Sequence, residues 1–143
     1  MKFLLTTPFL KIWLITVVIF IVLDMLWLGV FSKGFYNKHL GYLANKKNDS
    51  IVFNLPVGIV TQAIIATGLA ILISLGIQVE NTLLTAVLVG AISGFVIYAT
   101  YDLTNQSFIK DWPWMITIID ICWGTFQGTA AGFYIWWLWS VVK

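Results

Sequence analysis

The chain has 143 residues, of which 60% are hydrophobic, 16% are aromatic and only 10% are charged, with a net charge of +2. Soluble domains carry about 25% charged residues, so this composition, with a mean hydropathy of +0.94, indicates an integral membrane protein without an appended soluble enzyme. We expect one transmembrane domain over residues 1–143 and no nucleic-acid partner. The single cysteine, Cys122, excludes an intrachain disulfide and a cysteine metal cluster.

Four apolar segments are long enough to cross a bilayer, which takes about 20 residues in a helix. They predict an all-α fold, namely an integral membrane bundle of four transmembrane helices. The predicted helices cover approximately residues 12–31, 54–77, 82–102 and 114–139. Four crossings place both chain termini on one side of the membrane.

The connections between these segments differ in length and character. The connection after the first helix, residues 32–50, mixes aromatic side chains with lysines and one histidine, which predicts a short interfacial helix between helices one and two. Residues 78–81 allow only a tight turn, so the second and third helices should form an antiparallel hairpin. Residues 103–113 end in Trp112 and Pro113, which is typical of a helix start at the membrane interface.

Lysines near the helix ends indicate the orientation, because positively charged loops tend to remain in the cytoplasm. The two longer connections carry Lys33, Lys38, Lys46, Lys47 and Lys110, whereas the terminal side carries Lys2, Lys11 and Lys143. We therefore expect loops 32–53 and 103–113 to be cytoplasmic and both termini to lie outside. Because the difference is small, insertion in both orientations stays open, and the lysine distribution is compatible with a homodimer.

Three aspartates lie in or at the ends of the apolar segments, at Asp24, Asp102 and Asp120. An ionised carboxylate in hydrocarbon costs about 3 kcal/mol or more, so such residues usually face a bundle interior or a water-filled cavity. At a rise of about 1.5 Å per residue, Asp24 and Asp120 lie roughly 10 Å below the boundary on the side of the longer loops. Gln62 lies at a similar depth. The sequence therefore predicts a carboxylate pair in a cavity that opens to one membrane face.

A tryptophan follows two of these aspartates at i+3, since Trp27 follows Asp24 and Trp123 follows Asp120. That spacing places the indole and the carboxylate on one helical face, where the indole N–H can donate to an acidic partner and the ring can contact a cation. Two other interpretations stay open. Both tryptophans can serve in packing, and the two carboxylates can form a hydrogen-bonded or protonated pair that only locks the bundle.

Asp102 lies at the predicted end of the third helix, after Tyr101 and before Asn105. We predict that Asp102 and Asn105 form a gate at the mouth of the cavity. The alternative is that Asp102 is a solvated or capping residue at the helix end.

Small residues predict close helix packing. Gly90 and Gly94 form a G-x-x-x-G pair in the third helix, which lets a neighbouring backbone approach. The last helix carries a stripe of polar and small residues at Thr117, Gly124, Gln127, Gly128 and Ala131.

Enzyme motifs receive little support, because the chain contains no H-E-x-x-H, G-x-S-x-G or Gly-rich phosphate-loop pattern. We expect no metal and no cofactor, and we assign no catalytic residue. Our hypothesis is a cavity that binds a small cationic or amphipathic ligand and exchanges it for a proton shared by Asp24 and Asp120. The alternative is a membrane lipid-modifying enzyme, or its accessory subunit, acting at headgroup depth. Membrane lipids and a small-molecule ligand are the expected partners.

Several polar segments of the chain also carry a family resemblance. They are Tyr101-Asp102-Leu103-Thr104-Asn105, Asp111-Trp112-Pro113, Asp120-x-x-Trp123-Gly124, Asp24-x-x-Trp27-x-Gly29 and Phe35-Tyr36-x-x-x-Leu40-Gly41. On these motifs the chain resembles, over essentially its whole length, a family of small uncharacterised bacterial inner-membrane proteins catalogued as a domain of unknown function. The resemblance implies a four-helix protein of the bacterial inner membrane, and it implies no activity and no catalytic residue.

Overall fold

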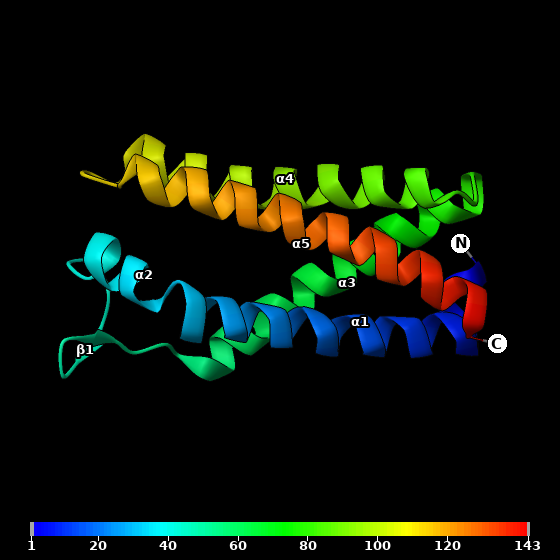
Figure 1. Ribbon diagram of the computed structural model, residues 1–143, viewed down its shortest axis with the longest axis horizontal. Coiled ribbons are helices and arrows are strands. Elements are labelled where there is room, and N and C mark those ends of the chain that lie inside the picture. The colour runs from blue at the N-terminus through cyan, green and yellow to red at the C-terminus, as the bar shows by residue number, and fades with distance from the viewer. Residues whose placement is uncertain (1, 143) are drawn as a thin grey trace.

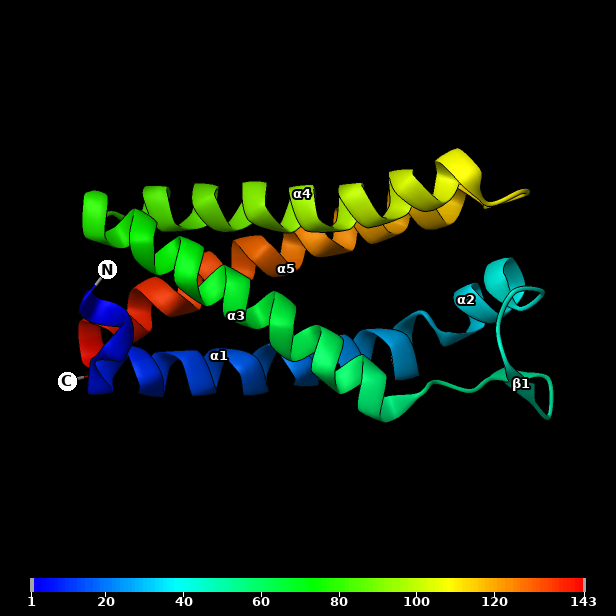
Figure 2. The same ribbon diagram turned by 180° about the vertical axis from the view of Figure 1, so that it is seen from behind.

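The computed structural model describes residues 2–142 and is almost entirely helical (Figure 1). Its helices are α1 (Thr7–Leu26), α2 (Lys33–Leu40), α3 (Leu55–Val79), α4 (Leu83–Phe108) and α5 (Trp114–Val141), with a 3₁₀ turn η1 (Lys2–Leu5) and a π-helical turn η2 (Trp27–Phe31). Figures 1 and 2 show the four long helices side by side, with both termini at one end and α2 at the other. We call the end that contains α2 the loop end. Met1 and Lys143 lie outside the described residues. Lys143 is one of the lysines used above to predict the orientation.

Within residues 2–142, three helical segments are long and apolar enough to cross a membrane. They are Thr7–Phe31, Leu55–Val79 and Leu83–Phe108. Helix α5 has sufficient length, at 28 residues, but is not among these three. The all-helical prediction is therefore confirmed, and membrane-spanning character is supported for three helices of the expected four.

Helices α1 and α4 extend furthest beyond the predicted bounds, whereas α3 and α5 each end two residues later than predicted. Helix α1 begins at Thr7 because the Thr6 side chain accepts a hydrogen bond from the Phe9 backbone N–H and a proline occupies the first turn. Helix α4 continues to Phe108 instead of ending at residue 102, because a drop in apolarity does not break a helix when no glycine or proline follows. Asn105 stays in this helix and is only 9% exposed. Asp102 therefore lies inside α4, so the prediction that it ends the helix is wrong.

The connection after α1 contains the predicted short helix, α2, and also a β-hairpin that the sequence pattern did not indicate. Strands β1 (Lys46–Lys47) and β2 (Ser50–Ile51) pair antiparallel. The two turn residues, Asn48 and Asp49, have φ angles of 50° and 57°, a left-handed conformation that Asn and Asp tolerate in two-residue hairpin turns. The Ile51 N–H donates to Asn37 Oδ1 at 2.7 Å, which ties the hairpin to α2.

Helices α4 and α5 pack with their backbones in contact along a seam of small residues. A β-carbon added at Gly94 would meet the Gly124 carbonyl, and one added at Gly128 would meet the Gly90 carbonyl. This seam confirms the close packing predicted from the glycine spacing. It holds α5 alongside α4 over much of its length (Figure 1).

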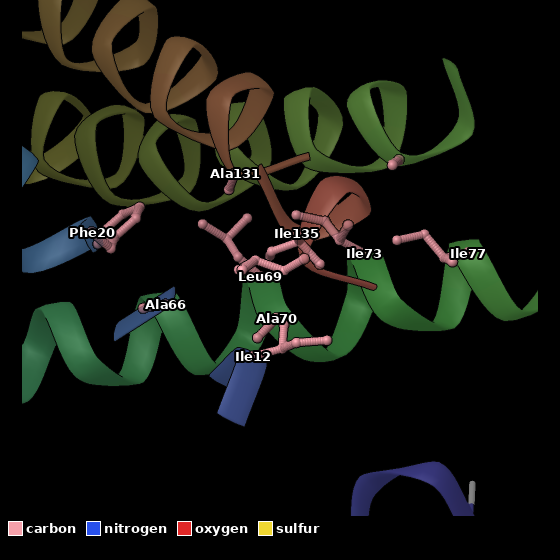
Figure 3. Close-up of a cluster of buried hydrophobic side chains, with 11 residues drawn as sticks. Ile12, Phe20, Ala66, Leu69, Ala70, Ile73, Ile77, Ala131 and Ile135 are labelled. Carbon is pink, nitrogen blue, oxygen red and sulfur yellow. The ribbon is translucent and has the colours of Figure 1, made fainter. Parts of the chain in front are cut away.

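The apolar core lies where α1, α3 and α5 meet. Figure 3 shows Ile12 and Phe20 of α1 beside Leu69 and Ile73 of α3, with Ile135 of α5 packed against them. The core runs from Phe20 toward the termini, so the aspartates lie between this packed region and the loop end. The packed half of the bundle therefore fixes the helices that present the polar side chains.

Candidate functional site: a carboxylate-lined cavity at the loop end

A cavity of about 420 Å³ lies among all five helices at the loop end. Its polar and aromatic walls combine the three aspartates with residues from every helix. The lining residues are Asp24, Trp27, Leu28, Tyr36, Leu40, Phe53, Thr61, Gln62, Ile65, Ile97, Tyr98, Tyr101, Asp102, Trp112, Asp120 and Trp123. Seven of the eight residues predicted for the site line this cavity; the eighth, Asn105, does not. The cavity thus brings together side chains that are up to 99 positions apart in the chain, Asp24 and Trp123.

Asp24 is held by donors from two other helices. Gln62 of α3 donates through Nε2 to one carboxylate oxygen, and Trp123 of α5 donates through Nε1 to the other at 3.1 Å. The side chain is only 2% exposed. Because both oxygens accept hydrogen bonds, Asp24 also joins α1, α3 and α5.

Asp120 has a different partner, which comes from α2. The Tyr36 hydroxyl donates to Asp120 Oδ1 and accepts from Trp27 Nε1 at 3.4 Å. Burial, together with the negative charge of Asp120, raises the pKa of the Tyr36 hydroxyl. The phenol therefore keeps its proton and remains a donor at neutral pH.

The two Asp-x-x-Trp segments interact crosswise. Asp24 of α1 accepts from Trp123 of α5, while Trp27 of η2 reaches Asp120 through Tyr36. Between these contacts the Trp27 and Trp123 rings stack, with centroids 4.3 Å apart and planes inclined by 8°. Helices α1 and α5 run antiparallel, so the aspartate of each helix lies at the depth of the tryptophan of the other helix. This explains the crossed contacts.

The turn η2 places Trp27 in this stack. The Ser32 backbone N–H and hydroxyl both donate to the Trp27 carbonyl, at 2.8 and 2.7 Å, and so close the π-helical turn. Single π-helical turns are frequent at functional sites, since they reorient the side chains that follow. Here the turn ends α1 and directs the chain into α2, whose Tyr36 returns to the cavity.

Asp102 differs from the other two aspartates, because neither carboxylate oxygen has a hydrogen-bond partner within residues 2–142, although the side chain is 0% exposed. Asn105, one turn on, also has an unpartnered buried amide nitrogen within the described part of the chain. Tyr101 is 63% exposed and packs edge-on to Trp112, with ring centroids 6.5 Å apart. The structure thus places Tyr101 at the outer edge and Asp102 inside, whereas the sequence placed Asp102 at the mouth.

Sequence reasoning missed four aromatic residues of the cavity: Tyr36, Phe53, Tyr98 and Trp112. Tyr98 packs over Gly124 and donates to Gln127 Oε1 at 2.9 Å. Tyr36, Phe53 and Trp112 belong to motifs or loops already noted, and Tyr98 lies in the predicted third helix, but the direction of all four side chains depends on tertiary contacts. Helical position relative to Asp102 would have identified Tyr98, since residues four apart share a face.

A contact between the two longer connections closes the loop end. The Tyr42 hydroxyl, after α2, donates to the backbone carbonyl of Asp111, between α4 and α5. Trp112 in turn donates to Thr117 Oγ1 at 3.2 Å. These bonds hold the α4–α5 connection next to the cavity that Trp112 lines.

Changing Tyr36 to phenylalanine should destabilise the loop end, because the hydroxyl connects Trp27 to Asp120. Leaving both groups without this partner should lower the free energy of unfolding by about 1–3 kcal/mol. The thermal unfolding midpoint in detergent is the readout, with Tyr101→Phe as the control because Tyr101 is mostly exposed. Equal midpoints for Tyr36→Phe and the wild type would contradict the bridging role.

Fold and site together define a small helical membrane protein with a carboxylate- and aromatic-lined cavity at one end of its bundle. The chain matches, over residues 9–137, the family described as "Predicted membrane protein (DUF2177)", and it belongs to that family. This membership confirms the resemblance inferred from the polar motifs. No curated protein and no solved structure matches the chain.

Proposed function

We propose that the protein binds an amphipathic organic cation in this cavity and exchanges it for a proton. The observation that carries the proposal is the buried Asp102 carboxylate, which lines the cavity and has no hydrogen-bond partner among residues 2–142. A buried acceptor without a partner is costly. A bound ammonium group would supply both the missing donor and the opposite charge.

The charge of the cavity walls favours a cation. Asp24, Asp102 and Asp120 line it, and within residues 2–142 no lysine, arginine or histidine does. Such an arrangement attracts positive charge in a low-dielectric region. A phosphate-bearing lipid headgroup would meet three acidic groups and no cationic one, so the lipid-modifying alternative has less support.

The remaining lining favours an amphipathic ligand over a small hydrated ion. Leu28, Leu40, Ile65 and Ile97 contribute aliphatic surface beside the aromatic rings. Trp27 and Trp123 stack on each other, so one face of each ring is already covered. In this proposal the two tryptophans form an apolar wall and hold Asp24 and Tyr36 by hydrogen bonds. Contact of a ring face with the cation, which the sequence suggested, has a smaller part.

Proton exchange and topology complete the proposal. Three acidic groups around one cavity cannot all stay ionised without a counter-ion, so a proton can take the place of the cation. Helix α5 would cross the bacterial inner membrane beside α4, with the loop end in the cytoplasm. Asp24 and Asp120 would exchange the proton, and Asp102 would receive the cation.

Calorimetric titration of the purified protein tests the binding step. We expect butylammonium to bind at least about tenfold more tightly than butanol, because only the ammonium donates charge-assisted hydrogen bonds to the aspartates. Equal affinity for the two ligands would show that the carboxylates do not select a cation.

A flux assay in proteoliposomes tests the exchange. With a proton gradient imposed, octylammonium uptake should fall to the level of protein-free vesicles in Asp24→Asn and Asp120→Asn, and should persist in Asp111→Asn, which changes an exposed aspartate. Equal uptake by all four proteins, wild type included, would contradict a proton-coupled role for the two aspartates.

A further inference from the structure

A second cavity, of about 210 Å³, lies on the other side of Asp24, between the end of α1 and the beginning of α3. Most of its walls are apolar. Its lining residues are Asp24, Met25, Leu28, Gly29, Phe53, Asn54, Leu55, Gly58 and Gln62. We call it the side cavity. Four of its residues also line the main cavity, namely Asp24, Leu28, Phe53 and Gln62. The two spaces are therefore adjacent, and their shared wall combines the Asp24–Gln62 pair with the apolar side chains of Leu28 and Phe53.

The side cavity faces a segment of the bundle where two glycines leave room. A β-carbon added at Gly29 or at Gly58 would meet nothing within 4 Å. These glycines contrast with those of the α4–α5 seam, where an added β-carbon would collide with backbone. Gly29 and Gly58 are therefore not needed for close backbone packing between helices. Their missing side chains leave open the space between η2 and the first turn of α3.

Two of the polar side chains that line the side cavity, Asp24 and Gln62, lie on the wall that it shares with the main cavity. Gln62 donates to Asp24 through its nitrogen, while its oxygen, Oε1, is buried and has no partner among the described residues. With the unpartnered Asp102 carboxylate, this oxygen adds an acceptor for an ammonium N–H. Apart from Asn54 at the start of α3, the side cavity beyond Asp24 and Gln62 offers aliphatic and aromatic surface.

We infer that the ligand is a single-chain alkylammonium, whose head lies among the aspartates of the main cavity and whose hydrocarbon chain runs along Leu28 and Phe53, beside the Asp24–Gln62 pair, into the side cavity. This inference rests on the proposed function and narrows it to one class of ligand. The chain enters from the lipid between η2 and α3, because the side cavity lies between these two membrane-facing segments. Charge complementarity positions the head, and the shared wall positions the chain.

Filling the side cavity tests this inference without altering an aspartate. In Gly58→Phe and, separately, Gly29→Phe, the new ring occupies the space proposed for the chain. Gly68→Phe is the matched control, since Gly68 also lies in α3 with nothing near its β-carbon position and lines neither cavity. Butylammonium and dodecylammonium are titrated against each variant in the same detergent, so that partition of the free ligand cancels in the comparison.

We expect both side-cavity variants to bind butylammonium as the wild type does and dodecylammonium about tenfold or more weakly, because overpacking of this kind excludes the long chain. Gly68→Phe should bind both ligands normally. Unchanged dodecylammonium affinity in both variants would place the chain elsewhere and overturn the inference, as would an equal loss of both ligands. If butylammonium binds the wild type no better than butanol does, the proposed function itself fails.

Discussion

Replacing Asp102 with asparagine should weaken alkylammonium binding and, at the same time, stabilise the ligand-free protein. The carboxylate is fully buried without a partner among the described residues, so its charge opposes folding when no cation is bound. The amide has nearly the same shape and no charge. We expect binding to fall about tenfold to a hundredfold, which corresponds to the loss of a hydrogen bond to a charged group, while the unfolding midpoint rises.

Opposite changes in binding and stability separate a ligand site from a structural residue. Calorimetry gives the affinity for butylammonium, and thermal unfolding in detergent gives the stability. Asp111→Asn is the control, because Asp111 is exposed in the α4–α5 connection and should change neither quantity. A loss of stability in Asp102→Asn with unchanged affinity would mean that Asp102 supports the fold and does not meet the ligand.

The second large effect concerns the seam between α4 and α5. Changing Gly128 to leucine should prevent stable packing of the two helices, because the new side chain would collide with the Gly90 carbonyl and the Gly94 α-carbon. Neither backbone atom can move without separating the helices. We expect a loss of about 3 kcal/mol or more in the free energy of unfolding, and the cavity should lose its α5 wall, which carries Asp120 and Trp123.

Gly68→Leu is the matched control for this substitution, since it adds the same side chain where nothing lies near the glycine. It should leave stability unchanged or slightly raise it, because leucine favours helix over glycine by up to about 1 kcal/mol. Unfolding midpoints of purified Gly128→Leu and Gly68→Leu provide the comparison. Similar midpoints for the two variants would show that the seam does not determine the packing of α5.

That Asp24, Gln62 and Asp120 lie at one level of the bundle could be predicted from the sequence, because the helical rise fixes distance along a helix. Asp24, Gln62 and Asp120 were placed in one layer on this ground, and all three line the same cavity. The glycine spacing likewise predicted close packing in α4. These predictions needed only positions within single helices.

Contacts between helices could not be predicted in the same way. The i+3 spacing relates Trp27 to Asp24 and Trp123 to Asp120 within each helix, yet the hydrogen bond to Asp24 comes from Trp123. This contact between an aspartate and the tryptophan of the other helix depends on the antiparallel packing of α1 against α5. The spacing of residues within one helix does not predict that packing. The contribution of Tyr36 depends on the path of the chain after η2, which returns α2 to the cavity.

The misplacement of Asp102 has a simpler cause. The apolar run ends at residue 102 and so predicts a helix end there, but helix α4 continues for six more residues to Phe108. Polar residues such as Asn105 remain helical when their side chains turn inward. Apolarity marks the part of a helix that contacts lipid, whereas helix length follows from caps and breakers.

A structure of the protein with octylammonium bound tests the central claim most directly. The account predicts ligand density in the main cavity, with the ammonium nitrogen within hydrogen-bonding distance of Asp102 and near Asp24 or Asp120. An unoccupied cavity at saturating octylammonium, or ligand found only on the outer apolar faces of the helices, would contradict it.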